Sequence, residues 1–198
     1  MLPLKPLNQD GYNGPCSPHL ILSNRNRTGQ VERLRQGHAE SPGQMKSKLD
    51  RIRTLLRSQT TLVLATAGED SLPRSTPLFF IADDDLRLYW FSSRSSLHSR
   101  NCARNPEASV AISRDARRWQ EIEGVQMQGV VSVVRDRGLR NEIARDYSAR
   151  FQLGNLFAFT IRHSSLYCFT PSWARYLDNS RRFGYRFELN LPADSSAR

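Results

Sequence analysis

Short apolar stretches separated by polar turns begin at Thr61, and they constrain the fold more than any other feature. Residues 61–66 (TLVLAT) and 74–81 (RSTPLFFI) flank the turn-forming sequence AGEDSLP, a pattern that predicts a β-hairpin. A third strand, residues 86–92 (LRLYWFS), follows the acidic run at 82–85, which we attribute to another hairpin turn rather than to a cation site. Strands joined by such short turns pair antiparallel.

Further strands are predicted in the second half of the chain, at residues 108–113, 123–134, 165–170, 173–178 and 185–191. Gly129 is the expected site of a β-bulge within the long strand 123–134. Helical periodicity is confined to residues 46–58, 95–104 and 136–151. This order excludes a regular βαβ alternation. It predicts a mainly β (α+β) fold, namely a six- to eight-stranded antiparallel split β-barrel with peripheral helices.

Residues 1–44 differ in composition from the remainder of the chain. They contain five of the ten prolines, five of the eleven glycines and only one of the eighteen aromatic residues. Such a segment buries too little surface to offset its conformational entropy, so we expect a disordered N-terminal extension. A second interpretation, in which translation begins at Met45, stays open. The domain itself is predicted at 45–192, with a flexible tail at 193–198.

The charge and the cysteine content limit which classes of protein the chain can belong to. The formal net charge of +10 is compatible with a polyanionic partner, but the 26 arginines and three lysines are scattered along the chain. The three cysteines, Cys16, Cys102 and Cys168, lack the spacing of zinc ligands and are interpreted as reduced thiols. No apolar run reaches the length of a membrane helix. We therefore expect a soluble, cytoplasmic protein without a metal site.

The sequence FSSRSSLHSRNCARNP, residues 91–106, concentrates hydroxyl and cationic side chains between a strand and a short helix. A helix that begins near Ser95 or Ser96 directs its free N–H groups toward those serines. Arg94, His98 and Arg100 add donors that suit a phosphate. The same residues also suit a serine-capped helix on the surface with solvated arginines, and both interpretations stay open on the residues alone.

Motifs for other chemistries are absent. The chain has no GxGxxG, GxxxxGK[ST], HExxH or GxSxG sequence, which argues against a Rossmann nucleotide site, a P-loop, a zinc protease and a serine hydrolase. No acid, base or nucleophile stands out as catalytic.

Three sequence segments in order resemble the FMN-binding split-barrel superfamily that includes pyridoxamine 5'-phosphate oxidase. They are TLVLATAGEDSLPRSTPLFFI, LRLYWFSSRSSLHSRNCARNPEASVAI and GVQMQGVV, and the resemblance extends over about residues 46–191. The tail WARYLDNSRRFGYRFEL is similar to an uncharacterised branch with an IDNS-R-GFG type motif. The resemblance implies a homodimer in which two chains share each FMN site.

The resemblance also implies a set of cofactor-binding residues. A ring and ribityl strand would run from Arg74 to Leu78, with Phe91 and Ser92 beside it, a phosphate turn would follow, and one residue would come from the partner chain. The full set is Arg74, Ser75, Thr76, Pro77, Leu78, Phe91, Ser92, Ser95, Ser96, Leu97, His98 and, from the partner chain, Gln126. Trp173, Arg175 and Asn179 are expected on the substrate side.

This chain departs from the oxidase pattern at the phosphate turn. The oxidase has an Arg-Lys pair there, whereas this chain has Leu97 and His98, which predicts a weaker grip on a phosphate. Pro77 is expected to break the ring-facing strand. Arg182 stands where related tails have glycine. No match to the oxidase's substrate-phosphate residues is found, so oxidation of vitamin B6 does not follow from the fold.

The resulting hypothesis is an FMN-binding protein, and specifically a flavin-dependent oxidoreductase that acts on an unknown small molecule. Three alternatives stay open: a split barrel that binds deazaflavin or haem, a non-catalytic module without a cofactor, and, least favoured, a nucleic-acid-binding protein.

Overall fold

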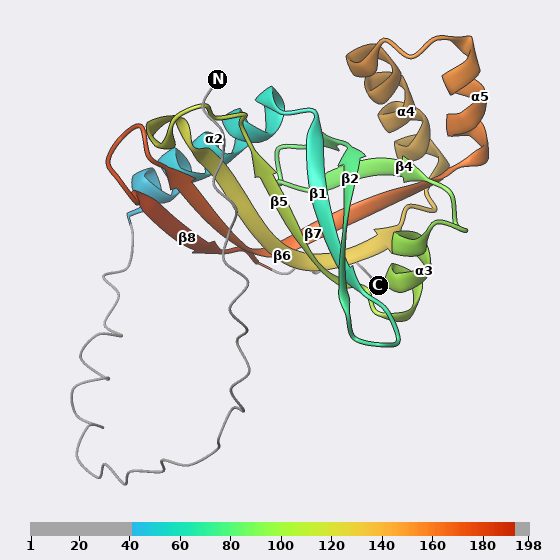
Figure 1. Cartoon of the computed structure of the whole chain (residues 1–198). Coiled ribbons are helices and arrows are strands. Elements are labelled where there is room, and N and C mark those ends of the chain that lie inside the picture. Colours follow the sequence, from blue (N-terminus) through green and yellow to red (C-terminus); the bar gives the residue numbers. More distant parts are fainter. Residues whose placement is uncertain (1–40, 193–198) are drawn as a thin grey trace, which may run out of the picture. The chain divides into compact units, whose positions relative to one another are not determined.

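The computed structural model describes residues 41–192, in which eight strands form one antiparallel sheet that curls into a split barrel (Figure 1). The strands are β1 (Thr61–Ala67), β2 (Pro73–Phe79), β3 (Ile81–Ala82), β4 (Leu88–Ser92), β5 (Glu107–Ser113), β6 (Glu123–Val133), β7 (Ser165–Asp178) and β8 (Arg186–Asn190). The order across the sheet is β2-β1-β5-β6-β7-β4-β3, and β8 pairs with β7. The predicted fold class is confirmed.

The helices are α2 (Pro42–Ser58), α3 (Leu97–Arg104), α4 (Arg137–Phe151) and α5 (Asn155–His163), with a short 3-10 helix, η2 (Trp119–Glu121). Three of them match the predicted helices, whereas α5 was not expected. The predictions for residues 1–40 and for the tail at 193–198 lie outside the described residues. Among the helices that the structure describes, none is both long and apolar enough to cross a membrane.

Helix α2 begins at Pro42, four residues before the predicted start at Lys46. Ser41 accepts a hydrogen bond from the Gln44 N–H, and the Gln44 side chain accepts one from the Ser41 N–H, which together form a capping box. Proline suits the first helical position because its missing N–H would have no acceptor there. Residues 42–44 therefore belong to the helix and not to the predicted disordered extension.

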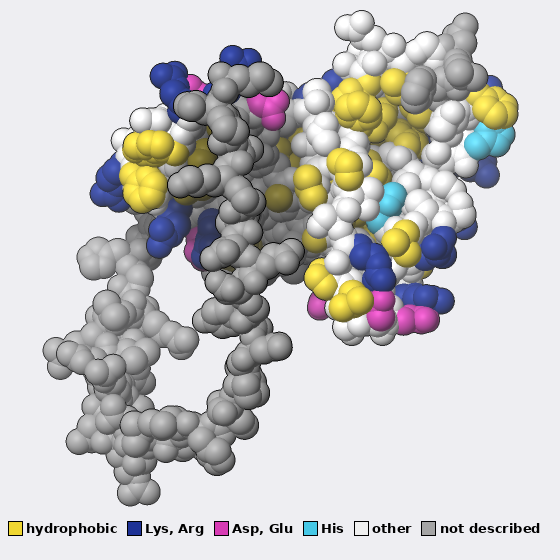
Figure 2. All heavy atoms as spheres, viewed as in Figure 1, with side chains coloured by type: hydrophobic (Ala, Val, Ile, Leu, Met, Phe, Trp, Pro, Cys, Tyr) yellow, Lys and Arg dark blue, Asp and Glu magenta, His cyan; other side chains and the backbone are white. Residues whose placement is uncertain are grey.

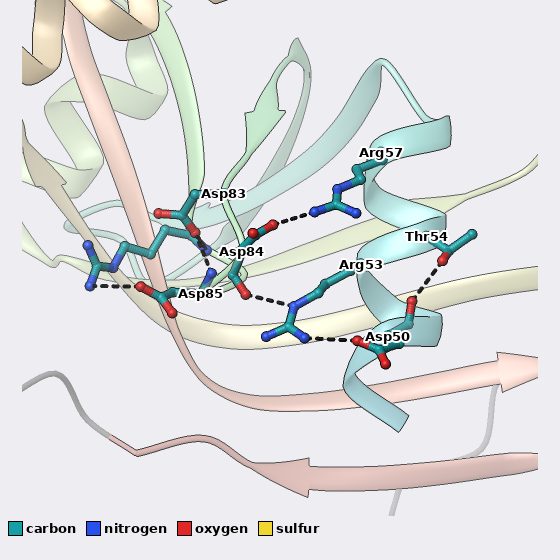
Figure 3. A network of polar contacts seen from close by, with 8 residues as sticks. Asp50, Arg53, Thr54, Arg57, Asp83, Asp84 and Asp85 are labelled. Atoms are coloured by element: carbon teal, nitrogen blue, oxygen red, sulfur yellow. Dashed lines mark hydrogen bonds and ion pairs between the residues drawn. The ribbon is translucent and has the colours of Figure 1, made fainter. Parts of the chain in front are cut away.

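Helix α2 is held to the turn between β3 and β4 by a polar network (Figure 3). The Arg53 Nε donates to the main-chain oxygen of Asp84 at 2.8 Å, and Arg57 forms an ion pair with the Asp84 carboxylate. Asp83 Oδ1 accepts main-chain hydrogen bonds from Asp85 at 3.0 Å and Arg87 at 2.9 Å. The acidic run therefore shapes a hairpin turn, as predicted. Among the side chains that the structure describes, no group of His, Cys, Asp and Glu is arranged to hold a metal ion.

The main core lies between α2 and the concave face of the sheet. Ile52 and Leu55 of α2 are fully buried against inward-facing strand residues, among them Leu64, Trp90 and Phe169. A second cluster lies under α4 and α5, where Tyr147 packs with residues such as Tyr89 and Leu166. The two helices thus cover the end of the sheet where β4 meets β7.

A β-bulge bends the two longest strands, β6 and β7, and confirms the role predicted for Gly129. The register between these strands shifts at Gln128 and Gly129. A Cβ atom at Gly129 would lie 2.1 Å from the main-chain oxygen of Thr170, so only glycine fits there. Because β7 continues through this bend, residues 165–170 and 173–178 form one strand and not the two that were predicted.

Candidate functional site

Strand β2 leaves one edge of the sheet open. The Phe80 N–H donates to the Thr60 oxygen at 3.1 Å, and hydrogen-bonded pairs alternate along an antiparallel ladder. Ser75, Pro77 and Phe79 therefore direct their main-chain polar groups away from β1. Pro77 sits opposite Val63 in an unbroken strand, so the expectation that it breaks β2 is wrong: an edge position without a ladder bond tolerates proline.

Arg74 stands at the start of this edge and already binds a carboxylate. Its guanidinium donates to the two carboxylate oxygens of Asp70 at 2.8 and 2.6 Å. Hydrogen bonding to Arg74 lowers the pKa of Asp70 to about 2. A Cβ atom at Gly68 would lie 3.3 Å from Arg74 Nη1 and 3.2 Å from Asn101 Oδ1, which places Arg74 next to α3.

A cluster of hydroxyl groups surrounds His98 where β4 leads into α3. The His98 Nε2 lies 2.8 Å from Ser92 Oγ and 3.1 Å from Ser96 Oγ. Ser96 Oγ also donates a hydrogen bond to the Ser99 hydroxyl oxygen at 2.8 Å. We call Ser92, Ser96, His98 and Ser99 the hydroxyl cluster. His98 is buried, and burial lowers its pKa, so its imidazole is neutral at pH 7 and supplies no positive charge.

The first turn of α3 completes this region. Ser96 is the N-cap, and the N–H groups of Leu97 and His98 lie in the turn where a helix offers no acceptor. The Leu97 side chain is 48% exposed, so the position expected to clamp a phosphate is open to solvent but apolar. Neither flanking arginine extends freely, because Arg94 donates to Ser165 Oγ at 2.9 Å and Arg100 to the Ser95 oxygen.

Buried polar side chains fix α3 against the sheet. Asn101 Nδ2 donates to Thr66 Oγ1 at 3.1 Å, and both residues are buried. Asn101 lies one helical turn after His98, so both side chains point to the same face of α3. Sequence reasoning missed Asn101, Thr66 and Ser99, although the His-x-x-Asn spacing was a signal that could have identified the buried face.

The remaining predicted site residues lie elsewhere. Phe91 packs under α4, with its ring 5.3 Å from the Tyr147 ring and 5.2 Å from the Arg140 guanidinium. Ser95 is exposed next to the hydroxyl cluster, and Thr76 and Leu78 are half-buried on β2. Gln126 is exposed on β6 opposite Arg175 of β7, ten residues along β7 from Ser165, the partner of Ser92, so a single chain does not bring it to the hydroxyl cluster.

The three residues expected on the substrate side make contacts within the chain. Arg175 forms an ion pair with Glu188 at 2.7 Å, and its guanidinium lies 5.5 Å from the Trp173 ring. Asn179 is buried between two loops.

A cleft of about 730 Å³ lies over the second half of β6. The side chains of Ala65, Ser109, Gln128, Val130 and Ser132 are among those that line it. These residues are small or half-apolar, and Glu107, at the start of β5, is the one carboxylate among the described residues that line the cleft.

The chemistry of the hydroxyl cluster suits a phosphate monoester better than a metal or an acyl-transfer reaction. Two serine hydroxyls and two main-chain N–H groups converge at one helix end, and each can donate to a phosphate oxygen. Cys102, the nearest thiol, is buried, and burial raises its pKa to about 11, so it remains a neutral, unreactive thiol.

Comparisons with known proteins agree with this fold. A family model described as pyridoxamine 5'-phosphate oxidase matches residues 49–178. No curated protein matches the sequence.

Three solved structures are similar. A Listeria innocua protein assigned provisionally as a pyridoxamine 5'-phosphate oxidase is 21% identical, with a TM-score of 0.56 over 66% of this chain and 98% of that one. The haem storage protein HutZ from Vibrio cholerae is 21% identical, with a TM-score of 0.52 over 62% of this chain and 88% of that one. A haem-binding protein from Mycobacterium smegmatis is 19% identical, with a TM-score of 0.56 over 72% and 57% of the two chains.

Proposed function

The chain belongs to the pyridoxamine 5'-phosphate oxidase family, and we propose that it binds FMN at the hydroxyl cluster and acts as a flavin-dependent oxidoreductase on a small molecule. The observation that carries the proposal is the convergence of Ser92, Ser96 and the first turn of α3, next to the open edge of β2. In this proposal the FMN supplies the hydride or electron chemistry.

Each part of the region would then have a distinct task. The serine hydroxyls and the Leu97 and His98 N–H groups would bind the phosphate of the cofactor. The main-chain N–H and C=O groups of Ser75 point away from β1 and would bond the polar rim of a flavin ring along β2, whereas the Phe79 oxygen already accepts a hydrogen bond from the Tyr147 hydroxyl at 3.1 Å. Neutral His98 would orient the two serine hydroxyls rather than contribute charge.

A homodimer is part of the proposal because one chain leaves Gln126 far from α3. The convex face of the sheet exposes apolar side chains, including Val63 at 42% and Val130 at 46% exposed, as a self-associating surface would. Light scattering coupled to size-exclusion chromatography is expected to give twice the mass of one chain. A monomer that binds FMN at full affinity would contradict the proposal that two chains share each site.

The cytoplasmic location of the protein also stays a prediction.

Haem is the second candidate ligand, because two structural neighbours are described as haem proteins and the phosphate turn lacks its Arg-Lys pair. Deazaflavin and a module without a cofactor remain further alternatives. The spectrum separates them: bound flavin absorbs near 450 nm, whereas haem gives a Soret band.

The experiment is a titration of the cofactor-free protein with FMN, followed by quenching of flavin fluorescence. Wild-type protein is expected to quench the flavin, and Ser92→Ala to weaken binding by about tenfold through the loss of one hydrogen bond to a charged group. Ser93→Ala, an exposed neighbour whose hydroxyl bonds Ser95, is the matched control and should bind as the wild type does. Absence of quenching at any concentration would reject the proposal.

A gain of affinity provides a sharper test. Leu97 is exposed, so Leu97→Arg introduces a guanidinium at the helix end without burying it. We expect FMN to bind at least tenfold more tightly. An unchanged affinity, together with an unchanged fold by circular dichroism, would mean that the phosphate lies elsewhere.

A further inference from the structure

Two loops present an exposed aromatic pair at the end of the sheet away from α3. Trp119 lies in η2 and Phe183 in the turn between β7 and β8, and their rings meet edge to face with centroids 5.3 Å apart. Trp119 is 52% exposed, Phe183 is 75% exposed and the adjacent Ile122 is 39% exposed. We call these three residues the aromatic platform. Exposed apolar side chains that adjoin one another, unlike single exposed ones, are typical of interaction sites.

A buried asparagine holds the aromatic platform in place. Asn179 Nδ2 donates to the Trp119 oxygen at 2.9 Å, and its Oδ1 accepts the Gly184 N–H at 3.0 Å. The Asn179 N–H donates to the Ile122 oxygen at 2.9 Å. One side chain thus ties both loops together. The rings are therefore organised before any ligand arrives, which lowers the entropic cost of binding.

Arginines flank the aromatic platform on both loops. Arg118 is paired with Glu121 at 2.7 Å, and Arg181 lies 3.7 Å from Asp178. The exposed side chains of Arg117 and Arg182 make no ion pair within the described residues. Figure 2 shows hydrophobic side chains beside Lys and Arg at the left end of the molecule, where Figure 1 places the turn between β7 and β8.

The aromatic platform is separate from the hydroxyl cluster. Strand β6 begins beside Ile122 and ends beside the β7 residues that pair with β4, so its eleven residues place the two regions about 30 Å apart. Figure 1 likewise shows α3 and the β7–β8 turn at opposite ends of the sheet. Within one chain, the aromatic platform is therefore a surface distinct from the hydroxyl cluster.

We propose that the aromatic platform and its arginines bind single-stranded nucleic acid. Unpaired bases stack on exposed rings regardless of sequence, while guanidinium groups contact the phosphates on either side. The net charge of +10 favours a polyanion over a neutral partner. An acidic protein would satisfy the arginines but would not need two pre-set rings.

The test is fluorescence anisotropy of a labelled twelve-residue oligo(U) with the full chain, in 50 mM and 200 mM salt. Wild-type protein is expected to bind, and affinity to fall with salt by a slope of about −0.7 for each phosphate contacted. Trp119→Ala and Phe183→Ala are each expected to weaken binding by about tenfold, and Trp119→Tyr to restore it. Arg117→Ala with Arg182→Ala should reduce the slope by about 1.4.

Phe159→Ala is the matched control, because Phe159 is 63% exposed on α5 and lies outside the aromatic platform. No binding in 50 mM salt, or an equal loss in Phe159→Ala, would overturn the proposal. A lower molecular mass of Trp119→Ala in light scattering, with oligo(U) binding intact, would identify the surface as a contact between copies of the chain. Equal binding of a poly-glutamate peptide would identify it as a general anion site.

Discussion

The two ends of strand β6 lie beside surfaces of opposite character. At one end the hydroxyl cluster is largely buried, and its polar atoms bond one another. At the other end the aromatic platform is exposed, and its order comes from a single buried side chain, Asn179, beneath it. To bind a ligand, the hydroxyl cluster must exchange its internal hydrogen bonds for bonds to that ligand. The rings of the aromatic platform are already held in place, so a ligand displaces only water from them.

This contrast decides how each surface responds to mutation. A ligand of the hydroxyl cluster competes with protein groups, so removing a competing group can raise affinity as well as lower it. The aromatic platform has no such competitor, so its substitutions can only weaken binding or loosen the loops. The experiments below test this difference, from the largest expected effect on stability to the smallest.

Gly129→Ala is expected to have the largest effect, because β6 connects both surfaces. The added Cβ would meet the Thr170 oxygen at 2.1 Å, so the strands must separate, at a cost of about 3 kcal/mol or more in the free energy of unfolding. Urea denaturation measures it. Gly43→Ala is the control, since no atom lies within 4 Å of a Cβ there, and helix propensity favours alanine. Equal stability of both variants would show that the bulge tolerates a side chain.

Asn179→Ala tests whether the aromatic platform and the hydroxyl cluster respond differently to one substitution. The substitution leaves the Gly184 N–H without its acceptor and unties Trp119, which should lower stability by about 1–3 kcal/mol. Ser180→Ala, a neighbour whose hydroxyl bonds only Asp178, should cost less than 1 kcal/mol. Oligo(U) binding should fall in Asn179→Ala while FMN binding is retained. A loss of both would show that the two surfaces belong to one site shared between two chains or are coupled through the sheet.

Local sequence patterns were sufficient to predict the strands, the bulge at Gly129 and the helix after Ser96, because each depends on neighbours in the chain. The same patterns could not show that Pro77 sits harmlessly on an open edge, since this depends on where β2 lies in the sheet. The burial of the His98 side chain could not be predicted either, because it depends on the contact with Ser92 on the preceding strand and on which face of α3 packs against the sheet. Helix α5 was not predicted, because no side chain caps its first turn.

The buried state of His98 predicts a pH dependence at the hydroxyl cluster. Burial lowers the pKa of His98 in the folded protein, so the unfolded chain binds more protons and stability rises with pH. The contribution is complete above the unfolded pKa of about 6.5 and is lost as pH falls toward the folded pKa. Its slope cannot exceed about 1.4 kcal/mol per pH unit, the limit for one proton.

Urea midpoints at pH 7.5 and pH 5 measure this effect as a difference between wild type and His98→Gln, which should flatten the dependence. Leu97→Gln, at the exposed adjacent position, does not titrate and should keep the wild-type slope. An unchanged slope in His98→Gln would mean that the imidazole is hydrated in solution and not enclosed by Ser92 and Ser96.

Arg74 and Asp70 give the smallest expected change in stability and the clearest test of competition. Their ion pair is exposed, so neither Arg74→Gln nor Asp70→Asn should shift the urea midpoint measurably. Their effects on FMN affinity should have opposite signs. Arg74→Gln removes a cation beside α3 and should weaken binding, whereas Asp70→Asn releases the guanidinium for the phosphate and should strengthen it. If both variants weaken FMN binding, Asp70 positions Arg74 for the ligand instead of competing with it. If neither changes the affinity, Arg74 belongs to the hairpin turn alone, and the hydroxyl cluster binds its ligand without a cation from β2.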